Sequence, residues 1–514
     1  MRSRTVYQLV TDRFARSSST TSTCDPGARE YCGGTWSDIS SQLSYIRGMG
    51  FDTIWVSPIV ANIGGTTGEG EAYHGYWTLN PEQLNSNFGS ETDLQSLASA
   101  VHAAGMYLIV DVVINHVAAT SSSTFSPSDS YGPFSASDDF HKFCWIDDYS
   151  NQTDVEQCWL GDTSVALPDL DTESSVVIDY WNTWITSLVS NYSIDAIRID
   201  TVKHIRQTFW PGFASAAGVY CVGEVLDGDA TYVSSYQNTS VNPFNYPIFY
   251  PLVRAFNSTS GNIGDLVTMA ASVKSSFQDP TLLGSFLNNH DNPRFENYTS
   301  DQALIMNAHA YPFVTDGITF AYYGSEAGFS GGNDPYNREP LWTSNYDTSS
   351  TMYQYFASLN AARSAAGNAS STFYTNQMTL SQPSDSVLQI VKSPLISLLT
   401  NVGSSGSASS VSISSSTSSW SANQVIVDAV TCTTLTTDSS GNLAVAFDSG
   451  KPRVLIADSQ KGSLCANGTS TSTSSATTSA STSTSTSTSK SAGERSVDAK
   501  WALCLLGLAS VFVL

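Results

Sequence analysis

Short apolar runs alternate with helix-like stretches over much of the chain. Patterns with helical spacing occupy residues 93–105 and 174–191. Strands that are apolar on both faces and separated by helices are typical of a parallel sheet covered by helices. With an eighth strand expected near residues 246–252, the pattern predicts an α/β fold, a closed (β/α)8 or TIM barrel. The apolar runs lie at residues 6–10, 52–58, 107–113, 196–200, 219–225, 282–287 and 318–324.

Two segments depart from this alternation. Residues 116–171 form a long interval rich in Ser, Asp and aromatic residues, which we interpret as a subdomain inserted after the third strand. From residue 375 the apolar positions recur with a period of two, which predicts an antiparallel β-sandwich domain over residues 375–465. The barrel itself would then comprise residues 1–115 and 172–374.

The end of the chain has the order of a GPI-attachment signal. Residues 466–491 are dominated by Ser and Thr and predict an O-glycosylated stalk, because they cannot bury a core. Small residues, a polar spacer and an apolar run too short for an ordinary membrane span follow. We therefore expect lipid attachment at Ser491, removal of residues 492–514, and a location at the outer face of the plasma membrane or in the cell wall. Because the chain starts without the apolar segment of a signal peptide, we expect the native gene to encode one upstream of Met1.

The charge balance limits the classes of partner. Acidic side chains outnumber basic ones by 45 to 22, and the formal net charge is −23. This excess argues against a surface that binds nucleic acid or anionic membranes. The 24 Tyr and 11 Trp residues suit a neutral substrate such as a carbohydrate, because aromatic rings stack on the C–H faces of sugars.

The cysteine pattern indicates an extracellular protein. Three pairs of cysteines that are close in sequence predict local disulfides rather than zinc sites. Cys221 lies within an apolar run and is predicted to be a free, buried thiol. The predicted pairs are Cys24–Cys32, Cys144–Cys158 and Cys432–Cys465. N-glycosylation sequons, which agree with secretion, lie at Asn151, Asn191, Asn238, Asn257, Asn297, Asn368 and Asn467.

Three carboxylates follow predicted barrel strands. In such barrels the catalytic residues lie at the C-terminal ends of the strands, and Asp200, Glu224 and Asp291 occupy such positions. A single strand-end carboxylate more often caps the next helix. Capping does not explain three of them accompanied by a cluster of basic side chains, so we expect them to converge on one site. The accompanying residues are His116, Arg198, His204 and His290.

Arg198 and Asp200 interrupt the apolar strand at 196–200. The alternating pleat of a strand points both side chains to the same face. A buried charge is costly unless it is paired or used. We therefore expect the Arg198 guanidinium to favour the ionised form of the Asp200 carboxylate.

These segments resemble the fungal Taka-type α-amylases of the α-amylase family of glycoside hydrolases. The similarity covers about residues 3–465. The four strand-end segments match the signature regions of that family in order, at residues 111–116, 197–204, 223–227 and 286–291. Further matching segments lie at residues 71–77, 155–162, 167–171 and 331–339.

The resemblance implies a retaining glycosidase with an α-glucan substrate. Asp200 would be the nucleophile, Glu224 the general acid and base, and Asp291 the carboxylate that distorts the sugar and stabilises the transition state. Such chemistry needs one protonated and one ionised carboxyl about 5–5.5 Å apart. Glu224 would be kept protonated by less polar surroundings and negative neighbours.

The resemblance also implies a set of substrate-binding residues. His74, His116 and His290 would bind hydroxyls of the glucose at the cleavage site, although a hydrogen-bonded core or surface histidine is the usual alternative. Tyr76, next to Trp77, would stack on that ring. The other residues are Lys203 and His204 on the leaving-group side, and Asp334 and Arg338 at the next subsite on the non-reducing side.

A calcium ion is implied at the junction of the barrel and the insertion. Asn115, Glu156, Asp169 and the backbone carbonyl of His204 match the ligands of the family. These are hard oxygen donors, which suit Ca²⁺ rather than zinc. The alternative is that Glu156 and Asp169 are solvated loop acids.

The sequence departs from the family at one cysteine pair, where Ser234 and Phe277 stand instead, so one disulfide is expected to be absent.

Three functions stay open for what we expect to be a monomer. The first is a hydrolase that cuts internal α-1,4 bonds of starch or glycogen. The second is a 4-α-glucanotransferase acting on cell-wall α-glucan through the same covalent intermediate. The third is an inactive wall glycoprotein that binds α-glucan, against which the intact set of carboxylates argues.

Overall fold

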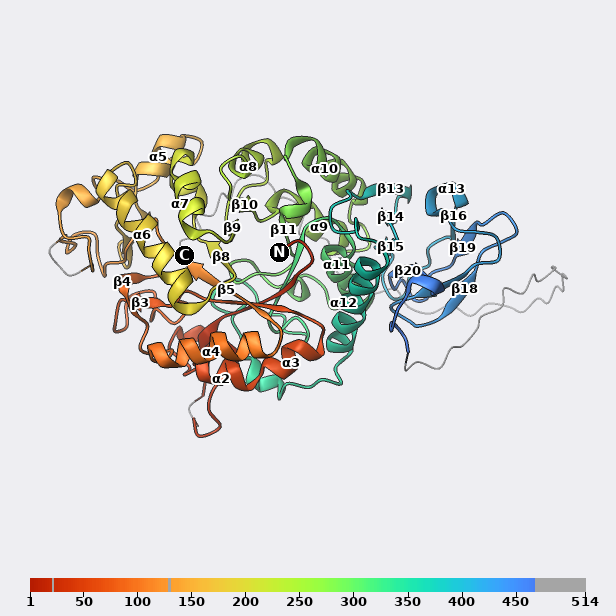
Figure 1. Ribbon diagram of the computed structural model, residues 1–514, viewed down its shortest axis with the longest axis horizontal. Coiled ribbons are helices and arrows are strands. Elements are labelled where there is room, and N and C mark those ends of the chain that lie inside the picture. Colours follow the sequence, from red (N-terminus) through yellow and green to blue (C-terminus); the bar gives the residue numbers. More distant parts are fainter. Residues whose placement is uncertain (21–22, 128–130, 467–514) are drawn as a thin grey trace, which may run out of the picture.

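The computed structural model describes residues 1–20, 23–127 and 131–466. Eight parallel strands form its centre, in the order β10-β9-β8-β5-β2-β1-β12-β11 (Figure 1). A parallel bridge between Phe244 and Gly284 joins the two outer strands, so the sheet closes into the predicted TIM barrel. The strands are β1 Thr5–Leu9, β2 Thr53–Val56, β5 Tyr107–Val112, β8 Ala196–Ile199, β9 Tyr220–Gly223, β10 Asn242–Pro243, β11 Gly284–Ser285 and β12 Ile318–Tyr322.

The eighth strand was predicted at the wrong place. Residues 246–252 lie in helix α9 (Tyr246–Phe256), and the strand is β10, just before it. The Asn245 side chain caps this helix by accepting a hydrogen bond from the backbone N–H of Ile248, and Pro247 occupies the first turn, where its missing N–H costs nothing. A short apolar run does not by itself distinguish a buried strand from a buried helix.

Helices surround the barrel (Figure 1). The two segments predicted from helical spacing correspond to α4 (Glu91–Ala103) and α6 (Ser175–Tyr192). Helix α4 begins at a capping box between Ser90 and Asp93, and its buried residues recur at helical spacing on one face. The remaining helices of this layer are α2 Trp36–Ser41, α3 Leu43–Gly48, α7 Trp210–Ala217, α8 Ala230–Gln237, α10 Ile263–Ser276, α11 Gln302–Val314 and α12 Thr351–Ala369.

The interval between β5 and α6 carries little regular structure. It contains the short helix α5 (Gln152–Gln157) and a small hairpin of β6 (Leu160–Gly161) and β7 (Ala166–Leu167). An aromatic cluster around Phe125 fills its interior, with rings from Tyr131, Phe140 and Trp159. The hairpin of β3 (Val60–Asn62) and β4 (Thr78–Leu84) lies beside it, because Ala118 N–H donates to the Thr78 carbonyl.

The C-terminal part is antiparallel, as predicted. Its larger sheet has the order β13-β14-β15-β20-β17-β18, and β16 pairs with β19 in a second sheet. Apolar side chains of both sheets, such as Leu398 and Val445, share one core cluster, which gives the two layers of a sandwich. The strands are β13 Thr379–Ser384, β14 Val387–Lys392, β15 Leu395–Thr400, β16 Val411–Ile413, β17 Val425–Asp428, β18 Thr434–Thr436, β19 Leu443–Val445 and β20 Arg453–Ala457.

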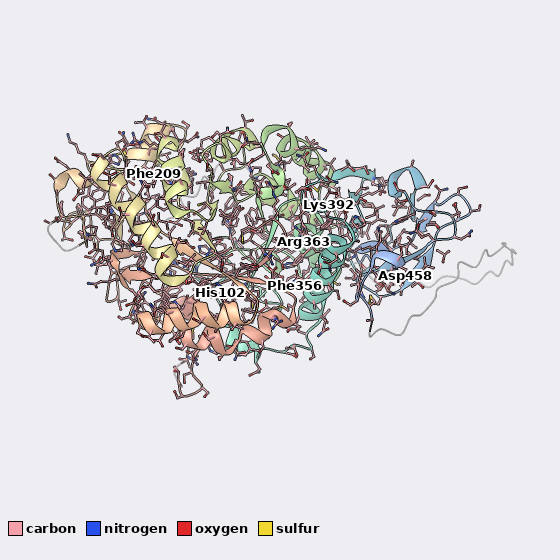
Figure 2. All side chains as sticks on the ribbon, in the orientation of Figure 1. His102, Phe209, Phe356, Arg363, Lys392 and Asp458 are labelled. Carbon is pink, nitrogen blue, oxygen red and sulfur yellow. A yellow bond between two sulfur atoms is a disulfide. The ribbon has the colours of Figure 1, made fainter. Side chains whose placement is uncertain are left out.

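Buried cations join this sandwich to the barrel. Figure 2 shows Arg363 and Lys392 at the junction, on α12 and β14. Lys392 forms an ion pair of 2.6 Å with Asp316, and both Lys392 and Arg363 lie over the ring of Phe373. Arg363 also donates to backbone carbonyls that precede β12, including that of Gly317. The Lys392–Asp316 pair is the contact that crosses from the sandwich to the barrel, and Arg363 orders the barrel side beside it.

The three predicted disulfides form, and Cys221 is a buried free thiol. Ser234 and Phe277 stand where the sequence resemblance implies another cysteine pair, and Phe277 is buried in the main core. The sequon asparagines of the described residues are exposed, except for the half-buried Asn257. Asn467, Ser491 and the predicted stalk lie outside the described residues. In the described part of the chain, no helix combines the length and apolar character needed to cross a membrane.

Candidate active site

The three predicted carboxylates meet at one end of the barrel. Asp200 follows β8, Glu224 follows β9, and Asp291 lies in the loop after β11; all three are buried. One guanidinium joins the first two, because Arg198 Nη1 lies 2.6 Å from Asp200 Oδ1 and Nη2 lies 2.7 Å from Glu224 Oε2. Both carboxyls are thus held by the two terminal nitrogens of the same guanidinium. The structure thus brings together the three carboxylates that were predicted from their positions at the ends of strands.

Asp111 is a further member of this cluster that the sequence pattern did not single out. It lies on β5 directly opposite Arg198 in the parallel register, and Arg198 Nη1 lies 3.0 Å from Asp111 Oδ1. Tyr76 and Trp55 donate hydrogen bonds to Asp111 Oδ2, at 2.7 and 3.1 Å. A single cation is therefore shared by three buried carboxylates. The signal in the sequence was an acid within an otherwise apolar strand.

Burial controls the protonation of these carboxyls. It raises the pKa of Glu224 to about 7, and the negative charge of Asp200 adds to the rise while Arg198 opposes it. Burial and the charge of Glu224 raise the pKa of Asp291 well above its usual range. The pKa of Asp200 is also raised by burial, although Arg198 acts in the opposite direction, as expected from the sequence. The cluster therefore retains protons at a pH where exposed carboxylic acids have lost theirs.

Three histidines line the same end of the barrel in neutral form. Burial lowers the pKa of His116 to about 4, and it lowers the pKa values of His74 and His290 well below the usual range. The His290 ring stacks on Tyr76 with centroids 5.0 Å apart and nearly parallel planes, and the His74 ring stacks on Tyr76 at 5.8 Å. His116 Nε2 lies 3.3 Å from the Tyr76 carbonyl. Tyr76 is thus the centre of this aromatic group.

Gln8 is a second residue that the sequence did not point to. It is buried on β1, and its side-chain Nε2 lies 2.7 Å from His290 Nδ1. An amide N–H₂ can only donate, so Nδ1 is the accepting nitrogen and the ring proton lies on Nε2. His290 Nε2 lies 3.2 Å from Asp291 Oδ1. The only signal in the sequence was a polar residue within an apolar strand.

Several buried polar atoms at this end have no hydrogen-bond partner within the described residues. Buried polar atoms are nearly always hydrogen-bonded, so such a group at one place indicates where a polar ligand binds. Hydroxyl-rich molecules supply both donors and acceptors to such atoms. The atoms are Asp200 Oδ2, both carboxylate oxygens of Asp291, His290 Nε2 and both ring nitrogens of His204.

A pocket lies between Tyr76 and the loop at 331–339. Arg338 Nη1 lies 2.8 Å from Asp334 Oδ1, and Arg338 Nη2 lies 3.8 Å from Asp291 Oδ1. The predicted residues His74, Tyr76, Trp77, Asp334 and Arg338 line it together with Arg29, Glu69, Tyr73 and Val165.

Lys203 and His204 lie together on the segment after β8. Lys203 Nζ donates to the Leu226 carbonyl at 2.9 Å, and Tyr149 contacts both residues, with its ring 5.1 Å from Lys203 Nζ. These contacts place Lys203 beside the segment that follows β9 and contains Glu224.

The predicted calcium ligands connect the barrel to the insertion. Asn115 Nδ2 donates to Asp169 Oδ1 at 2.8 Å, and Asn115 Oδ1 is buried and has no partner among the described residues. Gln152 Nε2 donates both to Glu156 Oε1 and to the Lys203 carbonyl, which holds Glu156 against the segment that contains His204. Burial raises the pKa of Asp169 to about 7. This donor set consists of oxygens and includes an orphaned amide carbonyl, so it fits a hard cation such as Ca²⁺.

His141 is a neighbour of this set that the sequence did not single out. Its Nδ1 lies 2.7 Å from Asp169 Oδ2, and its Nε2 lies 2.7 Å from Glu173 Oε2. The ring thereby orients the Asp169 carboxylate from the side opposite Asn115, as outer-shell partners of metal ligands do.

Comparison with known proteins agrees with this geometry. Residues 8–379 match the family model for the catalytic domain of alpha amylase, and residues 372–474 match the model for alpha-amylase domain C. The chain is 49% identical over 462 residues to alpha-amylase 1 of Lipomyces kononenkoae, covering 89% of this chain and 74% of that one. It is 45% identical over 468 residues to alpha-amylase 2 of Schwanniomyces occidentalis, covering 89% and 92%. The structure of an alpha-amylase from Malbranchea cinnamomea superposes with a TM-score of 0.87 at 42% identity, covering 90% and 98%.

Proposed function

The chain belongs to the α-amylase family of glycoside hydrolases, and we propose that it is a retaining enzyme that cuts internal α-1,4 bonds of starch- or glycogen-type glucans. The observation that carries this proposal is that Asp200 and Glu224 bind the two terminal nitrogens of one guanidinium, that of Arg198. Retaining glycosidases hold their two carboxyls about 5–5.5 Å apart, whereas inverting enzymes leave about 6.5–9.5 Å for a water molecule. Two carboxyls that bind one guanidinium are close together, which favours the first class.

Each carboxyl has a separate role in the reaction. Glu224, whose pKa is raised to about 7, holds the proton that passes to the glycosidic oxygen as the bond to the anomeric carbon breaks. Asp200 Oδ2, which has no partner among the described residues, forms the covalent bond to that carbon. Glu224 then removes a proton from water, which attacks the same carbon and releases Asp200.

The neutral side chains around Tyr76 position the sugar. Histidines without charge present one N–H donor and one acceptor, which suits hydroxyl groups better than an imidazolium does. The Gln8 contact places the His290 proton at Nε2, beside Asp291. Tyr76 lines the pocket, and its hydroxyl is anchored on Asp111. These residues fix the ring at the cleavage site.

Calcium is part of the proposal as a structural ion. Asn115, Glu156, Asp169 and the His204 carbonyl would hold it, supported by the orphaned Asn115 Oδ1. The ion supplies a cross-link between the insertion and the barrel. Because His204 belongs both to this set and to the substrate site, the cross-link also orders the leaving-group side of the cleft.

We also propose that the enzyme is a monomer held at the fungal cell surface by a GPI anchor on Ser491. The order of the C-terminal sequence supports the anchor: a Ser/Thr-rich stalk, three small residues, a polar spacer and a short apolar tail. The stalk would hold the catalytic domains away from the membrane, among the glucans of the wall.

Incubation with pure maltoheptaose tests the reaction type. Hydrolysis yields only products shorter than the substrate. Products longer than maltoheptaose would show that a sugar acceptor resolves the covalent intermediate and that the enzyme is a 4-α-glucanotransferase. A protein that binds the glucan but leaves it intact would be an inactive wall glycoprotein.

A further inference from the structure

Five charged side chains of alternating sign form a row from the catalytic centre to the surface. Asp291 lies 3.8 Å from Arg338, which lies 2.8 Å from Asp334; Arg29 then lies 3.7 Å from Asp334 and 2.5 Å from Glu69. Side-chain exposure rises from 8% at Asp291 to 27% at Asp334, 31% at Arg29 and 36% at Glu69. The row therefore ends in the Arg29–Glu69 pair at the outer end of the pocket.

The Arg29–Glu69 pair joins two loops across this pocket. Arg29 lies in the loop that the Cys24–Cys32 disulfide closes, and Glu69 lies in the segment between β3 and β4. The two loops touch along their backbones, because Glu71 N–H donates to the Arg29 carbonyl and a Cβ on Gly70 would lie 2.4 Å from Arg29 Cβ. Both side chains line the pocket with Asp334 and Arg338. The loops are thus fixed against each other with the ion pair between them.

The backbone conformation of Arg29 is one that favours glycine. The presence of arginine there indicates that its side chain is needed at this position. Arg29 has φ 52° and ψ 42°, in the left-handed region. A side chain in this region is strained relative to glycine. An arginine here therefore destabilises the loop locally, and its guanidinium offsets this by bridging Glu69 and Asp334.

We propose that the Arg29–Glu69 pair closes the non-reducing end of the cleft and limits how many glucosyl units lie on that side of the cut bond. This inference rests on the proposed function, and it takes the non-reducing side from the assignment of Asp334 and Arg338 that the family resemblance implies. A glucan that extends past Asp334 meets two side chains held by each other and by Asp334. Moving these two side chains apart would break the ion pairs that Arg29 forms with Glu69 and Asp334.

Arg29→Gly tests this inference without straining the fold, because glycine adopts the left-handed conformation freely. Maltoheptaose labelled at its reducing-end glucose is cut under initial-rate conditions, and the labelled fragments are sized. The labelled fragment is the leaving group in both hydrolysis and transfer, so its length reports how many units occupied the non-reducing side. We expect shorter labelled fragments with Arg29→Gly, with the share of such cuts rising at least about threefold.

Two further variants complete the test. Glu69→Gln keeps the size of the side chain and removes its charge, so it should shift the cuts in the same direction by less. Arg4→Ala is the matched control, because Arg4 forms a similarly exposed 2.8 Å pair with Asp52 at the other end of the barrel. It should leave the cut positions as in the wild type.

The outcomes distinguish a failure of the proposed function from a failure of the inference about Arg29 and Glu69. Wild-type enzyme that releases no labelled fragment would overturn the proposed function itself. Wild-type cleavage with the same fragment pattern in Arg29→Gly and Glu69→Gln would overturn the inference alone. Longer labelled fragments in Arg29→Gly would also overturn it, because they would show that Arg29 binds distant glucosyl units instead of excluding them.

Discussion

Gln8 Nε2 lies 2.7 Å from His290 Nδ1, at the end of the barrel where the carboxylates converge. The contact joins the first strand of the chain to a loop 282 residues later and fixes which ring nitrogen carries the proton. Since His290 is neutral and stacked on Tyr76, its orientation is set from both sides.

Gln8→Leu should lower kcat/KM about tenfold, because it leaves His290 Nδ1 without its donor and lets the proton move to the wrong nitrogen. Steady-state kinetics on maltoheptaose would measure this, together with ¹⁵N chemical shifts that identify the His290 tautomer. Gln95→Leu, on the exposed face of α4, serves as the control. Unchanged kinetics with an unchanged tautomer would contradict the role of Gln8.

Asp200→Asn and Glu224→Gln should each abolish turnover while glucan binding survives. Each change keeps the shape of the side chain but removes the nucleophile or the transferable proton. Sugar release and binding by calorimetry are the measurements. Retention of more than about a hundredth of the wild-type rate by either variant would be incompatible with the role given to that residue.

The pH profile should show a basic limb set by Glu224. The general acid must be protonated, so kcat/KM should fall as the pH rises through its pKa of about 7. Asp111→Asn should move this limb to lower pH, because Arg198 would then be less neutralised and would favour the charged form of Glu224. A basic limb that stays at the same pH in Asp111→Asn, or moves to higher pH, would contradict this account of the charged cluster.

Calcium removal should lower the melting temperature. A ligand bound only by the folded state adds RT ln(1 + [L]/Kd) to the free energy of unfolding. Thermal unfolding with and without EDTA measures the effect, and Asp169→Ala should abolish most of the difference. Asp162→Ala, a loop acid of the same insertion, should keep it. If the melting curve is unaffected by prolonged dialysis against EDTA, the calcium site is not there.

Expression of the full gene in a fungus should place the enzyme in the membrane or wall fraction. Phosphatidylinositol-specific phospholipase C should release it, because a lipid would then be its only attachment. Ser491→Leu should prevent attachment, since a small residue is required there. Mature enzyme that still carries its C-terminal peptide through Leu514 would exclude the anchor.

The sequence by itself was sufficient for those features that depend on local patterns. Apolar runs separated by helical periodicity determined the barrel, and period-two spacing determined the C-terminal sheets. The paired cysteines are only 8, 14 and 33 residues apart in the sequence, so the disulfides could be predicted. The three carboxylates could be predicted because the C-terminal ends of all barrel strands meet at one mouth.

Only the tertiary structure decided which distant side chains touch. An apolar run with a capping Asn245 forms the largely buried helix α9 rather than a strand, and its apolar pattern alone does not distinguish the two. Asp111 pairs with Arg198, 87 residues away, through the register of β5 against β8. The Arg29 bridge to Glu69 and Asp334 likewise depends on how three loops pack. Such contacts leave no periodic trace in the sequence, because their partners are brought together only by barrel closure.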